Sequence, residues 1–216
     1  MSKPTALITG GTGGLGLATA KLLVAKGWEV IVADCNQAAL DNLQQEQGIT
    51  SVFLDVTSTQ SVNAAFEQVK QQVRQLQGVV NFAGILAVGS MAEMKEETLQ
   101  RLLDINVMGT YRVNKAFLPL LGQGRIINIS SETGWQSGGP FNGAYAMSKH
   151  AIEAYSDSLR RELLLLSIPV IKIQPGPFKT DMVKSIERNF TQAADDSELF
   201  DKELRRICEL AMGEQK

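Results

Sequence analysis

Tyr145 and Lys149 lie four residues apart in a segment with helical periodicity. One helical turn separates them, so both side chains project from the same face of the helix. The pKa of a free tyrosine is about 10, and lowering it to about 7 requires about 4 kcal/mol of preferential stabilisation of the phenolate. A cation about 5 Å away, at an effective dielectric constant near 20, supplies roughly 3 kcal/mol. We therefore expect Tyr145 to act as a general acid and base, with Lys149 favouring its ionised form.

A glycine-rich turn near the N-terminus is the second chemical signal. Residues 9–16 include five glycines, and the turn lies between a buried strand and a helix with an apolar face. Without β-carbons the backbone can approach phosphate oxygens, and the helix N-terminus offers unpaired N–H groups to them. This context predicts a site for the pyrophosphate of a dinucleotide. The expected contacts are Gly10, Thr12, Gly14, Leu15 and Gly16.

Two aspartates follow later strands and bear on the choice of dinucleotide. Asp34 ends the second predicted strand, 18 residues after Gly16. A carboxylate there can accept hydrogen bonds from both adenosine ribose hydroxyls and would repel a 2′-phosphate, and no Arg or Lys is adjacent in sequence. We therefore expect NAD as the cofactor, with NADP less favoured. Asp55 ends the third strand, where it either meets the adenine or serves as an ordinary helix-entry aspartate.

Short apolar segments alternate with longer amphipathic segments along the whole chain. The apolar segments predict strands at residues 6–9, 30–34, 52–54, 79–82, 125–130 and 169–173. The amphipathic segments predict helices at residues 14–26, 36–47, 57–73, 96–118 and 144–165. Such alternation is typical of a parallel sheet that is covered on both faces. We therefore predict an α/β fold in which a single domain, residues 1–216, contains a doubly wound, Rossmann-like parallel sheet of about six strands.

Bulk composition narrows the possible partners. The chain has 216 residues, of which 44% are hydrophobic and 20% charged, with a formal net charge of −2. This composition gives no electrostatic case for binding nucleic acid, and no apolar run has the length of a membrane span. The two cysteines form no disulfide framework, and no cluster of histidine, cysteine or carboxylate has the spacing of metal ligands. We expect a cytoplasmic protein that binds no metal.

The motifs occur together and in order, and in this respect the chain resembles the short-chain dehydrogenase/reductase family over about residues 5–185. The resemblance rests on residues 9–16, 54–56, 81–84, 130–131, 145–149 and 175–180 and on Asn106. The tracts at residues 117–119, 124–127 and 148–151 are most similar to the branch of hydroxysteroid and retinol dehydrogenases. No counterpart of the family's last strand follows residue 180, so either the chain is naturally short or the given sequence stops before the original terminus. For the chain as given, the resemblance implies a homodimer formed by the long helices.

The resemblance implies a role for each residue that matches a motif. Tyr145 would be the acid and base, Lys149 would also hold the nicotinamide ribose, and Asn106 would support a proton relay through water. A serine would orient the substrate oxygen; Ser131 is favoured, although it lies 14 residues before Tyr145, and Ser130 remains open. Thr180 would bind the nicotinamide carboxamide. Further cofactor contacts are expected at Asp55, Val56, Asn81, Ala83, Gly84, Pro175, Gly176 and Phe178.

These expectations combine into a function. We expect an NAD-dependent oxidoreductase that interconverts a secondary alcohol and a ketone or aldehyde. Its small-molecule substrate is expected to be apolar, because two loops beside the site carry large apolar side chains. One of these loops is a substrate-loop segment at about residues 181–203. The apolar residues in the two loops are Trp135, Phe141, Met182, Ile186 and Phe190. Two alternatives remain open: a non-catalytic NAD-binding sensor or scaffold protein, and an epimerase or dehydratase with tightly held NAD.

Overall fold

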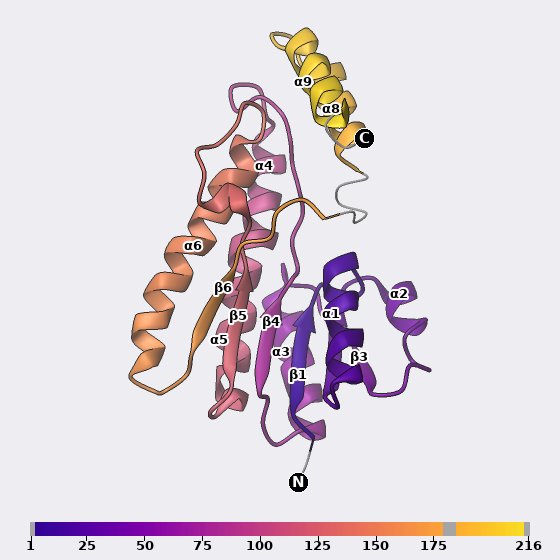
Figure 1. Cartoon of the computed structure of the whole chain (residues 1–216), viewed down its shortest axis with the longest axis vertical. Coiled ribbons are helices and arrows are strands. Elements are labelled where there is room, and N and C mark those ends of the chain that lie inside the picture. The colour runs from indigo at the N-terminus through magenta and orange to yellow at the C-terminus, as the bar shows by residue number, and fades with distance from the viewer. Residues whose placement is uncertain (1–2, 179–184, 214–216) are drawn as a thin grey trace.

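A parallel sheet of six strands forms the centre of the computed structural model, which describes residues 3–178 and 185–213. The strand order is β3-β2-β1-β4-β5-β6, so the chain runs outward from β1 in one direction and then from β4 in the other (Figure 1). This is the doubly wound topology predicted from the sequence, and the prediction is confirmed. The strands are β1 (Thr5–Thr9), β2 (Glu29–Asp34), β3 (Ile49–Phe53), β4 (Gly78–Asn81), β5 (Arg125–Ile129) and β6 (Val170–Ile173).

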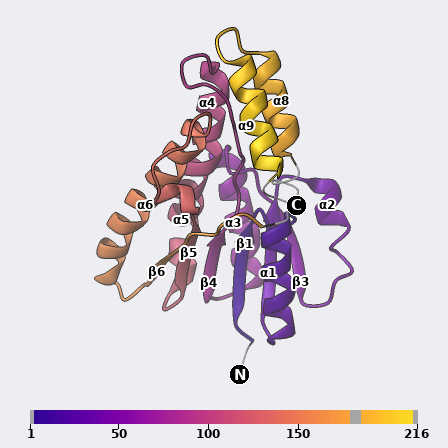
Figure 2. The ribbon, with the colours of Figure 1, turned by 45° about the horizontal axis from the view of Figure 1, so that its top comes forward.

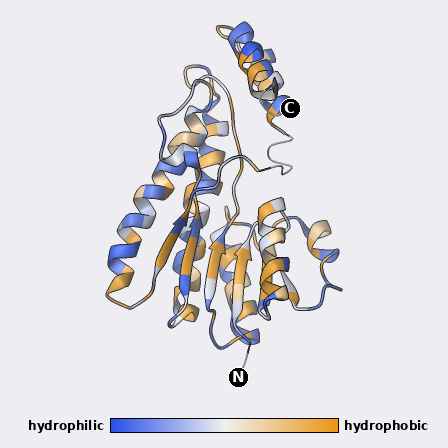
Figure 3. Cartoon of the chain, viewed as in Figure 1, coloured by the Kyte–Doolittle hydropathy of each residue, from blue (hydrophilic) through white to orange (hydrophobic). Residues whose placement is uncertain are grey.

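Helices cover both faces of this sheet. They are α1 (Gly14–Ala25), α2 (Gln37–Asp41), α3 (Thr59–Gln72), α4 (Glu96–Leu103), α5 (Thr110–Leu121), α6 (Gly143–Leu164), α8 (Ile186–Asp195) and α9 (Asp201–Gly213). Neighbouring residues of β1 show the two layers: Leu7 packs in the cluster with Phe117 of α5, and Ile8 packs in the cluster with Ala20 of α1. Because both faces of a central strand are buried, the strands are mostly apolar, as the orange stretches in Figure 3 show.

Two predicted helices differ from the observed ones. The helix predicted at residues 36–47 forms only as α2, which Asn36 caps by accepting a hydrogen bond from the N–H of Ala39. Beyond Asp41 the sequence is rich in glutamine and offers few apolar residues for a helix to bury, and the chain continues in turns. The helix predicted at residues 96–118 is observed as α4 and α5, joined by a π-helical turn at Asp104–Gly109.

Helices α8 and α9 form a hairpin beyond the carboxyl ends of the strands (Figures 1 and 2). Phe190 and Leu204 are buried between these helices, and Val88 and Phe141 from two loops beside the sheet pack against them. The carboxylate of Glu93 accepts hydrogen bonds from the hydroxyl of Ser197 at 2.6 Å and from the next two backbone N–H groups at 2.9 Å. The predicted substrate-loop segment, of which residues 181–184 lie outside the described part, therefore contains helix α8 and the start of α9.

Candidate active site

A cleft of about 1160 Å³ lies along the carboxyl ends of the strands, at the edge where the sequence predicted a ligand site. It brings together the glycine-rich turn, the ends of the other strands, and the start of α6. Most residues predicted from the sequence line it: Gly10, Thr12, Gly14, Leu15, Gly16, Asp34, Asp55, Val56, Ala83, Gly84, Ser131, Tyr145, Lys149, Pro175, Gly176 and Phe178.

The glycine-rich turn has the geometry of a phosphate cradle. Gly10 has a φ of 62°, and a β-carbon there would lie 2.7 Å from the backbone nitrogen of Ala83. A β-carbon on Gly16 would collide with the carbonyl oxygen of Gly10. Only glycine allows this close packing. Helix α1 begins directly behind the turn, so its first N–H groups and the positive end of its dipole point toward the cleft.

Asp34 is held rigidly at the end of β2. One carboxylate oxygen accepts hydrogen bonds from the hydroxyl of Thr12 at 2.6 Å and from its N–H at 3.2 Å, and the other accepts the N–H of Asn36 at 3.1 Å. The carboxylate thus joins the glycine-rich turn to the edge of the adjacent strand. Asp55 also lines the cleft, yet its Oδ1 accepts two hydrogen bonds from Thr57, at 2.7 and 2.9 Å, as a helix-entry aspartate does.

The electrostatic field beside Asp34 can be read from the neighbouring Cys35. Burial raises the pKa of the Cys35 thiol, and the charges of Asp34 and Asp55 raise it further. Arg101 of α4 acts in the opposite direction. The sequence showed no basic residue next to Asp34, and the fold brings one into the same region of the cleft. Asp34, Asp55 and Arg101 all line the cleft, so a ligand bound at this end would meet two carboxylates and one guanidinium.

Tyr145 and Lys149 both lie on the side of α6 that faces the cleft. The Lys149 Nζ lies 5.6 Å from the centre of the Tyr145 ring and donates a hydrogen bond to the carbonyl of Ile129 at 2.9 Å. Burial lowers the pKa of Lys149 to about 8. Burial also raises the pKa of Tyr145, and a hydrogen bond with Ser131 counteracts this rise. Lys149 was expected to favour the ionised form of Tyr145, and burial opposes that form.

Both candidate serines line the cleft, and their hydroxyls have different partners. Ser131 interacts with the Tyr145 phenol, and its Oγ also accepts the N–H of Thr133 at 3.3 Å. Ser130 is 3% exposed and donates to the carbonyl of Lys149 at 3.4 Å, so its hydroxyl is directed toward α6. Of the two hydroxyls, the one on Ser131 is therefore placed with Tyr145.

Asn106 lies in the π-helical turn, where its side chain is almost completely buried. Its Oδ1 accepts the N–H of Ile85 at 2.8 Å, and its Nδ2 donates to the Ile85 carbonyl and to the Ser148 hydroxyl, both at 3.0 Å. Ser148 in turn donates to the carbonyl of Tyr145 at 2.7 Å. Asn106 therefore connects the segment after β4 to the helix that carries Tyr145, and its amide is fully used in doing so.

One predicted cofactor contact among the described residues, Asn81, does not line the cleft. Asn81 is buried, and its Nδ2 donates to Asn114 at 2.8 Å and to Asn128 at 2.9 Å, which joins β4, β5 and α5 beneath the cleft. This amide stabilises the sheet, and the neighbouring Ala83 and Gly84 line the cleft instead. Thr180 lies outside the described residues.

Comparison with known proteins identifies the family. A model described as "short chain dehydrogenase" matches residues 4–190, which is most of the chain. The chain belongs to the short-chain dehydrogenase family. The resemblance inferred from the motifs is thereby confirmed.

Relatives of this short-chain dehydrogenase include retinol and steroid dehydrogenases. Retinol dehydrogenase 7 of Mus musculus is 36% identical over 208 residues, covering 90% of this chain and 65% of that protein. The human 17-beta-hydroxysteroid dehydrogenase type 6 is 37% identical over 191 residues, covering 84% of this chain and 60% of that protein. The chain thus spans 65% and 60% of the lengths of these two relatives.

Solved structures support the same family and fold. A short chain dehydrogenase/reductase of Burkholderia phymatum in complex with NAD has a TM-score of 0.79 and 25% identity, covering 85% of this chain and 69% of that one. An actinorhodin polyketide ketoreductase with NADPH has a TM-score of 0.82 and 28% identity, covering 88% and 76%. Since one neighbour holds NAD and the other NADPH, the family comparison does not decide between the two cofactors.

The cleft of this short-chain dehydrogenase also contains residues that the motifs did not indicate. They are Ile85, Leu86, Arg101, Glu132, Thr133 and Asn142, among others. Most lie in segments between the regular elements, where no periodicity guides a prediction. For Asn142 a signal was present, because it lies three residues before Tyr145 and directly precedes α6.

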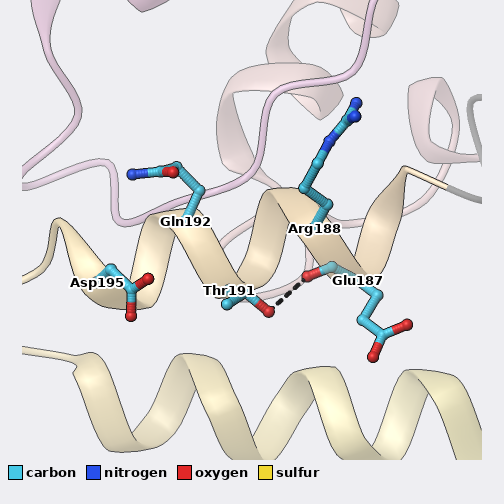
Figure 4. A pocket seen from close by; sticks show the side chains of 5 residues that line it. All are labelled: Glu187, Arg188, Thr191, Gln192 and Asp195. Carbon is cyan, nitrogen blue, oxygen red and sulfur yellow. Dashed lines mark hydrogen bonds between the residues drawn. The ribbon is translucent and has the colours of Figure 1, made fainter.

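Elsewhere the described residues offer little for chemistry. A smaller hollow of about 350 Å³ lies on α8, lined by polar side chains from Glu187 to Asp195 (Figure 4). There the hydroxyl of Thr191 donates to the carbonyl of Glu187 within the same helix. Over residues 3–178 and 185–213 no three histidine, cysteine or carboxylate side chains are grouped to hold a metal ion. In the same ranges no helix is both long enough and apolar enough to cross a bilayer.

Proposed function

We propose that this protein is an NAD-dependent oxidoreductase that interconverts a secondary alcohol and a ketone or aldehyde. The observation that carries the proposal is the placement of Tyr145 and Ser131 together in a cleft that also contains the glycine-rich turn. Family membership supports the reaction class. Because the chain spans only part of the length of its relatives, their substrates are not transferred to it.

The residues of the cleft would have different roles in this reaction. The hydroxyl of Ser131 and the phenol of Tyr145 would hold the substrate oxygen between them. Tyr145 would remove the proton of an alcohol, or return a proton to the oxygen when a carbonyl is reduced. Lys149 would stabilise the phenolate and hold the nicotinamide ribose. Bound NAD supplies the hydride acceptor, and the glycine-rich turn and Asp34 would hold its pyrophosphate and adenosine ribose.

The choice of NAD rather than NADP rests on the field beside Asp34. Asp34, Asp55 and Arg101 line the cleft there, so the carboxylates outnumber the guanidinium. At an effective dielectric constant near 20, like charges about 5 Å apart repel by roughly 3 kcal/mol, which is about a hundredfold in affinity. A 2′-phosphate would meet this repulsion, whereas ribose hydroxyls can donate hydrogen bonds to the carboxylate.

An apolar substrate body is consistent with the walls of the cleft. The apolar residues Leu86, Pro177, Phe178 and Ile186 line the same cleft as Tyr145, and Phe178 is 53% exposed. The α8–α9 hairpin contributes Ile186 and is fixed in place through Glu93 and the buried Phe190. We therefore propose a substrate whose carbon skeleton contacts these side chains while its reacting oxygen reaches Tyr145.

The reaction is tested by replacing Tyr145 with Phe. Removal of the acid and base should lower kcat/KM by about 10²- to 10⁴-fold and leave NADH affinity nearly unchanged. Tyr155→Phe is the matched control, because Tyr155 is on the same helix, outside the cleft lining, with its hydroxyl 3.3 Å from Asn114. Steady-state rates over a panel of secondary alcohols and ketones provide the measurement. Activity of Tyr145→Phe equal to that of Tyr155→Phe would exclude Tyr145 as the base.

The cofactor assignment is tested by Asp34→Asn, which removes the charge and keeps the shape of the side chain. We expect the wild-type protein to bind NADH about a hundredfold more tightly than NADPH, and the variant to lose most of this preference by binding NADPH better. Fluorescence titration with both reduced cofactors measures the four affinities. A wild-type protein that prefers NADPH would show that the carboxylate does not set the choice.

We also propose that the protein is a cytoplasmic homodimer. Exposed apolar side chains on consecutive long helices support the dimer. Met108, just before α5, is 43% exposed, Tyr111 at the start of α5 is 40% exposed, and Met147 of α6 is 40% exposed. Burial of such side chains against a second copy would remove apolar surface from water.

A further inference from the structure

Glu132 adds a carboxylate to the wall of the cleft beside the proposed reacting groups. It directly follows Ser131, whose hydroxyl interacts with the Tyr145 phenol, and all three residues line the cleft. The Glu132 side chain is partly exposed, and in the described part of the chain its carboxylate forms neither a hydrogen bond nor an ion pair. Its charge is therefore available to a ligand, and the proposed reaction has not yet given it a role.

Both the backbone and the side chain of Glu132 lie against the segment that follows β6. The N–H of Glu132 donates a hydrogen bond to the carbonyl of Pro175 at 3.1 Å. A β-carbon on Gly176 would lie 3.3 Å from the Oε2 atom of Glu132, so the carboxylate lies next to this glycine. Pro175 and Gly176 line the same cleft. The carboxylate is thus placed where the chain leaves β5 and β6.

The strand order indicates which half of a dinucleotide would meet this carboxylate. The glycine-rich turn follows β1 and Asp34 ends β2, so the pyrophosphate and the adenosine ribose are assigned to β1 and to the side of the sheet formed by β2 and β3. Strands β4, β5 and β6 lie on the other side of β1, which leaves their ends for the nicotinamide. Hydride transfer also requires the nicotinamide to lie beside a substrate whose oxygen is held by Ser131 and Tyr145. Both arguments bring the nicotinamide next to Glu132.

The two redox states of the cofactor differ in charge at this ring. Oxidised nicotinamide is positively charged, whereas the reduced ring, which carries one more hydride, is neutral. A carboxylate therefore attracts the oxidised ring and has little effect on the reduced one. For unit charges about 6 Å apart, effective dielectric constants of 80 and 20 correspond to roughly threefold and a hundredfold in affinity. A partly exposed carboxylate lies between these limits, at about tenfold.

We propose that Glu132 discriminates between the redox states of the cofactor, by strengthening the binding of NAD⁺ relative to that of NADH. This inference rests on the proposed function, since it assigns a further cofactor-binding residue to the same site. Its consequence concerns the direction of the reaction on the protein. When a bound carbonyl is reduced, its carbon receives the hydride with two electrons from NADH, its oxygen receives a proton from Tyr145, and NAD⁺ is formed. Glu132 stabilises that bound product state and so favours reduction.

The test measures binding of NAD⁺ and NADH to the full chain by isothermal titration calorimetry, without substrate and therefore without turnover. Glu132→Gln removes the charge and keeps the shape of the side chain. The ratio of the Kd for NADH to the Kd for NAD⁺ should be about tenfold larger in the wild-type protein than in this variant. ADP-ribose, which lacks the nicotinamide, is titrated as well, because a change in repulsion of the pyrophosphate would affect all three ligands alike.

Two further variants control for the substitution. Glu132→Asp keeps the charge and should retain most of the discrimination. Glu67→Gln makes the same change in net charge at a side chain that is 61% exposed on α3, outside the cleft lining, and should leave the ratio unchanged. Because the Glu132 carboxylate has no partner among the described residues, the melting temperature of Glu132→Gln should stay close to that of the wild-type protein.

The outcomes separate the inference from the proposed function. The same ratio of the two Kd values in the wild-type protein and Glu132→Gln, with turnover of secondary alcohols or ketones by the wild type, would overturn the inference and leave the proposed function intact. A ratio that changes as expected, without turnover of any alcohol or ketone, would support the inference and contradict the proposed function. Binding of neither NAD⁺ nor NADH would contradict both.

Discussion

Replacing Lys149 with Met should make the cofactor-free protein more stable, although it removes a residue proposed to be essential. Lys149 is 7% exposed, and burial lowers its pKa from 10.5 to about 8. The corresponding penalty on its charged form at neutral pH is about 3 kcal/mol, at about 1.4 kcal/mol for each tenfold change in protonation. Loss of the hydrogen bond to Ile129 offsets about 1 kcal/mol of this. The net gain is therefore about 2 kcal/mol, or roughly 4–8 °C in Tm for a chain of this size.

The gain should depend on pH in a defined direction. Below about pH 8 the folded and unfolded wild-type chains both carry the proton, so the full penalty destabilises the folded state. Between about pH 8 and pH 10.5 the folded chain has lost the proton and the unfolded chain still binds it, so the stability of the wild-type protein rises relative to the variant. Above about pH 10.5 neither state is protonated at this residue, and the advantage of Lys149→Met should disappear.

Differential scanning calorimetry of both proteins without cofactor, from pH 6.5 to pH 10.5, measures this dependence. Lys70→Met is the control, because the Lys70 side chain is 55% exposed on α3, where it makes a surface ion pair with Glu67 and lies 5.6 Å from the centre of the Phe66 ring. Its stability difference from the wild-type protein should be small at every pH. A Lys149→Met protein that is less stable than the wild type at pH 7, or a difference that does not change with pH, would refute the assignment of a burial penalty to Lys149.

Two further predictions concern the support of the site and the assembly. Ser148→Ala removes the two hydrogen bonds that join Asn106 to the Tyr145 backbone, each of which contributes about 1 kcal/mol, so the Tm should fall by roughly 4–8 °C. The change in kcat should be larger than the change in the KM for NAD. Calorimetry and steady-state kinetics measure these effects, and an unchanged Tm would contradict this role of Ser148. Light scattering should give twice the 23.5 kDa mass of the chain, and a monomer or a tetramer would contradict the proposed homodimer.

The sheet could be predicted well from the sequence because its strands are buried on both faces. Residues such as Leu7 and Ile8 point into different cores and must both be apolar, which produces the short hydrophobic runs. Once the strands are parallel, the residues that follow them meet at one edge, which is why Asp34 and Ser131 could be assigned to a common site. These inferences depend only on burial and strand direction.

Helix boundaries and side-chain directions could be predicted less well from the sequence. The π-helical turn at Asp104–Gly109 adds a residue to the helix, and no apolar periodicity shows where such a turn occurs. It brings Asn106 against Ile85 and Ser148, contacts that a continuous α-helix predicts poorly. Adjacent extended residues point to opposite sides, so the different directions of Ser130 and Ser131 could be expected, but not which of them would face Tyr145.

The structure also changes the physical account of the acid and base. Burial favours the uncharged form of both residues, raising the pKa of Tyr145 and lowering that of Lys149 to about 8. Ionising Tyr145 in this environment therefore costs more than the about 4 kcal/mol estimated for a tyrosine whose starting pKa is near 10. Lys149 can contribute only while it keeps its proton, a condition that is lost as pH rises through 8. Stabilisation of the phenolate must then come from several sources acting together: the Ser131 hydroxyl, a protonated Lys149, and any positive charge that a ligand brings into the cleft.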